Sequence, residues 1–116
     1  MNHPHTLTRA THDALLLQLS RERDWLQLAR ESLLLLRHSA MTGDLVALDA
    51  AVQQQTALAA ARAELSANRD LIFQQAAEQL GVPERPVTLL ALAARMSPTA
   101  RKPVVAVRRE LASSAR

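Results

Sequence analysis

The sequence predicts an all-α protein: a long antiparallel helical hairpin, followed by a short third helix and a C-terminal helix that packs on or beside the hairpin. Two observations indicate this fold class. The 48% apolar residues are mostly Leu and Ala, with one Trp, one Phe and no Tyr, a mixture that favours helices over a β core. Residues 12–40 and 44–80 contain neither Gly nor Pro, and only Met41-Thr42-Gly43 separates them. We expect one helical domain over residues 1–116.

The first long helix is predicted over residues 12–40, with Thr11 or Asp13 as its N-cap and a flexible polar segment, residues 1–11, before it. Apolar residues recur at intervals of four and three, which gives this helix a seam that a partner helix has to cover. The predicted seam is Leu15, Leu19, Glu22, Leu26, Ala29, Leu33, Leu36 and Ala40. More than one neighbour is expected to cover the helix, because leucines also lie outside the seam: Leu16, Leu17, Leu28, Leu34 and Leu35.

The turn of the hairpin is expected at Gly43, which adopts backbone angles that other residues resist. Thr42 or Asp44 can cap the helix that follows. That helix is predicted to end at Gly81, since Pro83 prevents its continuation. The hairpin therefore covers residues 12–81.

The two long helices are predicted to pack in a defined register. The contact residues expected from the second helix are Leu45, Leu48, Val52, Leu58, Leu65, Ile72 and Leu80. Folding the chain back at Gly43 sets Leu19 opposite Leu65 and Leu33 opposite Val52. It also sets the large ring of Trp25 opposite small alanines, Ala57 and Ala59 to Ala61, the complementary packing that a close helix pair requires.

The last third of the chain, residues 82–116, is predicted to hold a linker and two short helices. Residues 82–87 form the linker, and Thr88 caps a helix over residues 89–96 that Ser97 and Pro98 stop. Pro103 is expected at the first position of a final helix. Seven basic residues stand here against two acids. The final helix has little to terminate it, and we expect the chain to be truncated there.

This last third is also the predicted partner-binding segment. The residues assigned to that role are Leu89, Leu92, Met96, Val104, Val107, Arg108 and Leu111. In one alternative their apolar members fold onto the hairpin and complete a three-helix core. In the other they form a groove or a mobile amphipathic arm that receives a partner helix. Both hold if a loosely docked arm exchanges an internal partner for an external one.

No catalytic or metal-binding constellation can be assembled from the sequence. The absence of Cys removes disulfides, thiol catalysis and thiolate metal sites. His3 and His5 form an H-x-H pair without two further ligands in reach, and no E-x-x-H pair accompanies the helical carboxylates. The nucleophile-elbow and P-loop patterns do not occur. We expect a binding module that is not an enzyme and uses no cofactor or metal.

The chain is expected to be cytoplasmic and not inserted in a membrane. Its N-terminus lacks an apolar run of signal-peptide length, and its longest apolar run, residues 33–36, is far shorter than the roughly 20 residues that span a bilayer. The basic last third has no aromatic residue to stack on bases or to anchor in a lipid interface. Nucleic-acid binding through its arginines is a weaker alternative, and a structural coiled-coil module that forms homo-oligomers is a stronger one.

The order of these features resembles the FlgN-type flagellar export chaperones. The resemblance covers roughly residues 13–111. It begins with Trp25 in a leucine-rich first helix, followed by Gly43-Asp44-Leu45-Val46-Ala47-Leu48. It continues through Glu64-Leu65 and Arg69 of an Ala/Gln-rich second helix, then Leu80-Gly81 and Thr88-Leu89.

This resemblance implies a chaperone that binds the C-terminal amphipathic helices of hook–filament junction proteins in the cytoplasm. Such a chaperone prevents premature assembly of its clients and delivers them to components of the type III export apparatus. The resemblance also implies that residues 89–111 carry the client site. The family's last helix continues beyond the point at which this chain stops, at Arg116.

Overall fold

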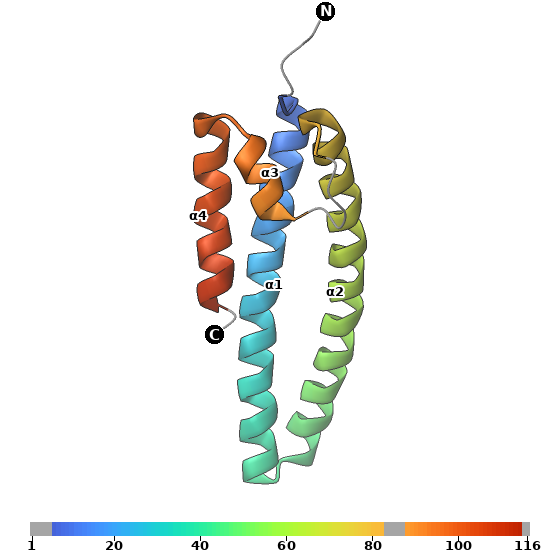
Figure 1. Cartoon of the computed structure of the whole chain (residues 1–116). Helices are drawn as coiled ribbons and strands as arrows, with labels where there is room; N and C mark the ends of the chain where they lie inside the picture. The colour runs from blue at the N-terminus through green and yellow to red at the C-terminus, as the bar shows by residue number, and fades with distance from the viewer. Residues whose placement is uncertain (1–5, 83–87, 115–116) are drawn as a thin grey trace, which may run out of the picture.

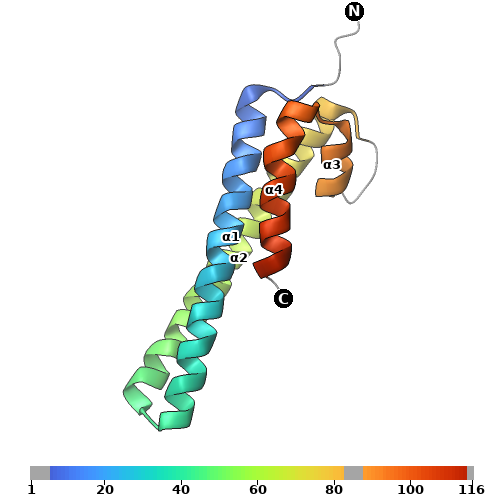
Figure 2. The ribbon, with the colours of Figure 1, turned by 90° about the vertical axis from the view of Figure 1, so that its left-hand side faces the viewer.

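The computed structural model describes residues 6–82 and 88–114, which form four helices and no strand. These are α1 (Arg9–Thr42), α2 (Leu45–Leu80), α3 (Leu89–Arg95) and α4 (Pro98–Ser114). α1 and α2 run antiparallel along a molecule that measures 67 × 22 × 22 Å (Figure 1). α4 packs along α1, and α3 contacts α2 and α4 (Figures 1 and 2). The predicted fold class is confirmed.

The turn between the long helices has the predicted chemistry. Gly43 ends α1 with φ 72°, a left-handed conformation that disfavours side chains, and its N–H donates to the carbonyl of Ser39. Asp44 caps α2 by accepting the N–H of Ala47 at 3.0 Å. Gly81 ends α2 in the same way, with φ 68°.

The N-terminal cap of α1 was predicted wrongly. The cap is Thr8, whose Oγ1 accepts the N–H of Thr11, and the helix begins at Arg9 rather than at residue 12. Thr8 is held in this position from α2, because its backbone N–H donates to Oε1 of Gln79 at 3.0 Å. Thr8 and Gln79 are 71 residues apart in the sequence, so this contact cannot be predicted from the local sequence.

The predicted α1 seam is only partly correct: Leu15 and Leu19 are fully buried in the core, whereas Leu33 and Ala40 are exposed. Hydrogen bonds show which row faces α2: Gln18 Nε2 donates to the carbonyl of Leu65 at 2.8 Å, and Gln55 Nε2 donates to Ser32 Oγ at 2.9 Å. The row that faces α2 is Thr11, Leu15, Gln18, Glu22, Trp25, Ala29, Ser32, Leu36 and Ser39. It keeps the spacing of four and three, but several of its members are polar.

The α2 seam departs from the prediction near the turn, whereas the predicted contact residues Ile72 and Leu80 are buried in the core. Ala51 is buried, whereas the predicted contact residues Leu45 and Val52 are 75% and 50% exposed. Leu33, expected opposite Val52, is 56% exposed. Small or hydrogen-bonded polar side chains take the buried positions there, Leu36 and Leu48 are half-buried, and Leu33, Leu45 and Val52 are exposed.

The C-terminal helices follow the predicted order with one error. Thr88 caps α3 as expected, accepting the N–H of Ala91 at 3.1 Å. Pro98 was expected only to stop α3, but it is also the first residue of α4. A proline fits this position because the first residue of a helix needs no partner for a backbone N–H. Pro103 therefore lies inside α4 and not at its first position. The Ser97 hydroxyl supports the earlier start by accepting the N–H of Ala100 at 3.3 Å.

The hydrophobic core occupies the half of the hairpin away from the turn. It contains Leu15, Leu19, Ile72, Phe73, Ala76, Ala77, Leu80, Val82, Leu89, Leu92, Met96 and Val104. α4 is attached to α1 at two further points: His12 Nε2 donates to the carbonyl of Ala100 at 3.0 Å, and Arg23 bonds Glu110 at 2.8 Å. Because α4 extends along only part of α1, the distal half of the hairpin, next to the turn, consists of two helices alone (Figure 2).

Candidate functional site

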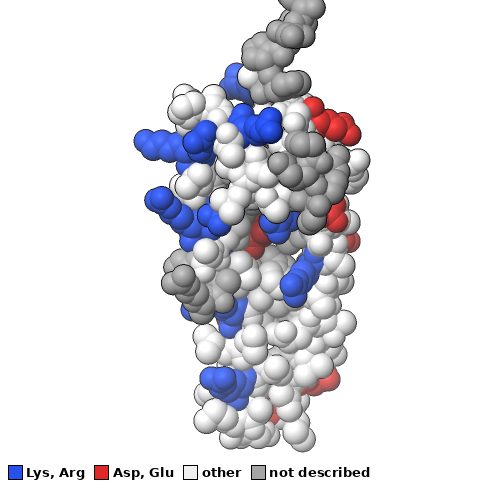
Figure 3. Space-filling view, viewed as in Figure 1, with Lys and Arg blue, Asp and Glu red and all other residues white. Residues whose placement is uncertain are grey.

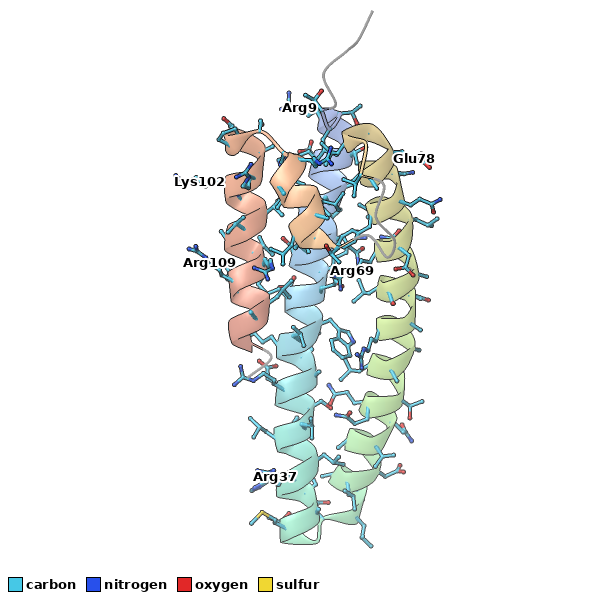
Figure 4. All side chains as sticks on the ribbon, viewed as in Figure 1. Arg9, Arg37, Arg69, Glu78, Lys102 and Arg109 are labelled. Atoms are coloured by element: carbon cyan, nitrogen blue, oxygen red, sulfur yellow. The ribbon has the colours of Figure 1, made fainter. Side chains whose placement is uncertain are left out.

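A cleft of about 450 Å³ opens where all four helices meet. Glu22 and Leu26 of α1, Arg62 and Arg69 of α2, Leu89 of α3, and Arg108 and Leu111 of α4 contribute to its lining. Figure 3 shows it as a hollow with an acidic side chain visible inside and basic side chains around it. Arg69 lies below α3, between α1 and α2, in Figure 4.

Glu22 and Arg69 form the charged floor of the cleft. Arg69 Nη1 donates to Glu22 Oε1 at 3.4 Å, and its guanidinium lies over the ring of Phe73 at 4.8 Å from the centroid. The other carboxylate oxygen of Glu22 is buried without a hydrogen-bond partner among the described residues. Burial therefore raises the pKa of Glu22, and the charge of Arg69 offsets part of the rise.

Trp25 forms the wall of the cleft toward the turn. Its indole N–H donates to the carbonyl of Leu58 at 2.8 Å, and the guanidinium of Arg62 lies 5.6 Å from the ring centroid. The predicted register is matched, because Leu58 lies among the alanines expected opposite this ring and Ala61 lines a hollow together with Trp25; the contact with Arg62 was not predicted. The ring keeps α1 and α2 apart and leaves a hollow on each side of the seam.

Toward the turn, two rows of uncharged residues extend from the cleft along α1 and α2, and Leu33 of the α1 row lines a separate hollow of about 250 Å³ between Arg30 and Arg37. Residues seven apart lie on the same face of a helix in a two-helix seam, so each cleft residue identifies the row that extends from it. The α1 row is Leu26, Leu33 and Ala40, and the α2 row is Ser66, Ala59, Val52 and Leu45. We call these two rows the distal groove. Below the hollow, the middle of the face in Figure 3 is mostly uncharged, with basic side chains toward its left edge and acidic side chains toward its right edge.

The distal groove exposes large apolar side chains. Leu33, Val52 and Leu45 are 56%, 50% and 75% exposed. Between them the hairpin interior holds Ser32, which is fully buried, and Gln55. A surface that is more apolar than the interior it covers is characteristic of an interaction site.

The seven predicted partner-binding residues divide between the core and the cleft, and Leu89 belongs to both. Leu92, Met96 and Val104 are buried in the core, and Val107 packs against it. Leu89, Arg108 and Leu111 line the cleft. In this structure the apolar members fold onto the hairpin, which is the first of the two alternatives considered for them.

Sequence reasoning missed the distal groove because it placed Leu33, Val52 and Leu45 inside the hairpin. A signal was present in the chain. Ser32 and Ser39 are seven residues apart, and both are buried, as a second polar row with the same spacing as the leucines. Two rows with the same period leave it undecided which of them faces inward.

The described part of the chain contains no group of three or more His, Asp or Glu residues that could hold a metal ion. His3 and His5 lie outside the described residues, as does most of the predicted linker at residues 82–87. Nor does any helix within the described ranges combine the length and apolar character needed to span a membrane.

Comparisons with known proteins add no relative. No family model, curated protein or solved structure matches this chain.

Proposed function

We propose that this protein is a chaperone that holds an amphipathic helix of a partner protein in the cleft and the distal groove. The observation that supports this most strongly is that, in the distal half of the hairpin, the exposed side chains are more apolar than the buried ones. There Ser32 and Ala51 are buried and Ser32 bonds Gln55, while Leu33, Val52 and Leu45 are exposed in rows that extend from the cleft. A helix that inserts an apolar face between two rows of this kind is a common mode of peptide recognition.

The dimensions and charges define the partner further. From Leu26 to Ala40 the groove runs about 21 Å along α1, the length of roughly four helical turns. The cleft at its end is lined by Arg62, Arg69 and Arg108 against one acid, Glu22. We therefore expect an amphipathic helix with an uncharged apolar face and an acidic residue at the end that enters the cleft.

The resemblance to the FlgN-type chaperones supplies the client class. On this proposal the clients are hook–filament junction proteins, held by their C-terminal helices in the cytoplasm until they pass to the export apparatus. Sequestering an exposed apolar face prevents association between clients before export. A contact burying about 800 Å² on each partner is sufficient for specific binding and still reversible.

Trp25 offers a direct test, because it is the chain's single Trp and forms part of the cleft wall. Synthetic C-terminal peptides of hook–filament junction proteins are titrated into the protein while tryptophan fluorescence is recorded, using peptides without Trp. We expect a saturable change in fluorescence, and a dissociation constant raised at least about tenfold by Leu33→Asp or Val52→Asp.

Leu90→Asp is the matched control, since Leu90 is 59% exposed on α3 and does not line the cleft. It should leave the dissociation constant unchanged. Binding that survives Leu33→Asp and Val52→Asp would move the site away from the distal groove. Absence of binding by every junction peptide would exclude the proposed client class.

A further inference from the structure

The opposite side of the hairpin carries a second exposed row on α1. Its members alternate at intervals of four and three residues: Leu17, Arg21, Asp24, Leu28, Glu31 and Leu35. The three leucines are 52%, 50% and 55% exposed, and the three charged residues are exposed as well. We call this row, with the α2 residues beside it, the rear face.

The rear face is separate from the cleft and from α4. A hollow of about 550 Å³ lies in it, lined only by α1 and α2. Arg21, Asp24 and Leu28 line it from α1, and Ala61 and Glu64 line it from α2. Trp25 is exposed to this hollow on one side and to the cleft on the other, so the two sites lie on opposite sides of the α1–α2 seam.

The α1 row is complementary to itself at two of its three pairings when it is reversed. A twofold axis that passes between Asp24 and Leu28 pairs each residue with one on a second copy running antiparallel. Asp24 then meets Leu28 of the second copy, a charged residue against an apolar one. Leu17 meets Leu35 of the second copy. Arg21 meets Glu31 of the second copy, and the symmetry repeats each contact. A parallel arrangement would instead set Arg21 against its own equivalent, which like-charge repulsion disfavours.

The α2 side of the rear face is compatible with the same axis. The hydrogen bond from Trp25 to the carbonyl of Leu58 places that part of α2 level with the axis. Ala57 and Ala61 lie on either side of this level, so the rotation sets alanine against alanine. The next residues of the α2 row, Gln54 and Glu64, meet as an amide and a carboxylate. No pair of like charges arises between the two α2 helices.

We propose that a second copy of this chain docks antiparallel on the rear face, so that two hairpins form a four-helix bundle with Asp24 and Leu28 of each copy nearest to its twofold axis. The α1 contact from Leu17 to Leu35 extends over about 27 Å. This dimer does not rest on the proposed function, because the distal groove stays open on the outside of the bundle. Each chaperone of the pair keeps its own client site.

Sedimentation equilibrium of the full chain, from about 1 to 200 µM, tests the dimer by mass action. We expect a dimer whose dissociation constant rises at least about tenfold in Arg21→Glu and in Glu31→Arg, because each variant places like charges together twice across the axis. The double variant Arg21→Glu/Glu31→Arg restores opposite charges and should recover the dimer. Arg37→Glu, outside the row, should leave it unchanged.

Three results would overturn the proposal. The first is a monomer throughout the concentration range. The second is a dimer that resists Arg21→Glu but dissociates in Leu33→Asp, which would place the contact in the distal groove. The third is a double variant that stays monomeric while circular dichroism shows native helix content.

Discussion

Trp25 is the residue on which the spacing of α1 and α2 depends, and its replacement tests the packing directly. A tryptophan side chain buries about 150 to 250 Å². At roughly 25 cal/mol per Å² this amounts to about 4 to 6 kcal/mol as an upper limit. Trp25 is only half-buried and has a hollow on each side, so we reduce the expected loss for Trp25→Ala to about 3 kcal/mol.

The hydrogen bond of Trp25 can be separated from the packing of its ring. Trp25→Phe keeps an aromatic ring and removes only the donor to the Leu58 carbonyl. That carbonyl lies within α2, where the helix supplies its own N–H donor. The loss for Trp25→Phe should therefore be about 1 kcal/mol or less. Comparing the stability lost in Trp25→Ala with that lost in Trp25→Phe shows whether Trp25 acts through the packing of its ring or through its hydrogen bond.

The assay is urea unfolding followed by far-ultraviolet circular dichroism, at one fixed protein concentration because association changes the apparent stability. Leu90→Ala is the control, since its side chain is 59% exposed and its loss should stay within about 0.5 kcal/mol. A Trp25→Ala variant as stable as this control would refute the role of the ring as a packed spacer.

Three further outcomes are expected from the same unfolding assay. Glu22→Gln should be more stable than the wild type at pH 7 and lose this advantage as the pH falls toward 4.5. The pKa of Glu22 is raised in the folded state, so the charged carboxylate destabilises the fold only as the pH rises through that pKa. A stability difference that does not change with pH would contradict this. Thr8→Ala should cost about 1 kcal/mol through loss of the α1 cap, and Thr6→Ala, outside the helix, close to nothing. Gly43→Ala should cost about 1 kcal/mol from backbone strain alone, because φ is 72° and no atom lies within 4 Å of the added Cβ; a stabilised variant would show that the turn relaxes.

The helix boundaries could be predicted wherever one residue decides them. Gly43 and Gly81 end the long helices, and Asp44 and Thr88 cap the next ones, because caps and left-handed turns depend on local chemistry. The N-cap of α1 failed because Gln79, distant in the chain, selects Thr8 over its neighbours. Local rules contain no information about such a partner.

The candidate site was predicted less well than the fold, and leucine content is the reason. Leu19, Leu26 and Leu33 have the spacing of a seam, and the first is buried, the second lines the cleft and the third is exposed. The row whose side chains form hydrogen bonds to α2 is a different one. That row includes Gln18 and Ser32, whose hydrogen bonds to α2 satisfy polar groups that hydropathy alone would place in water.

The two halves of the hairpin depend on different sources of stability. Near the termini, large side chains such as Leu15, Leu19 and Phe73 are removed from water by their own chain. Near the turn, Ser32 and Ala51 bury little apolar area, so α1 and α2 gain little there to offset the entropy of ordering. The leucines that would supply the missing burial face outward. On the proposed function, a partner helix that covers them adds this burial, so partner binding should stabilise the distal half of the hairpin.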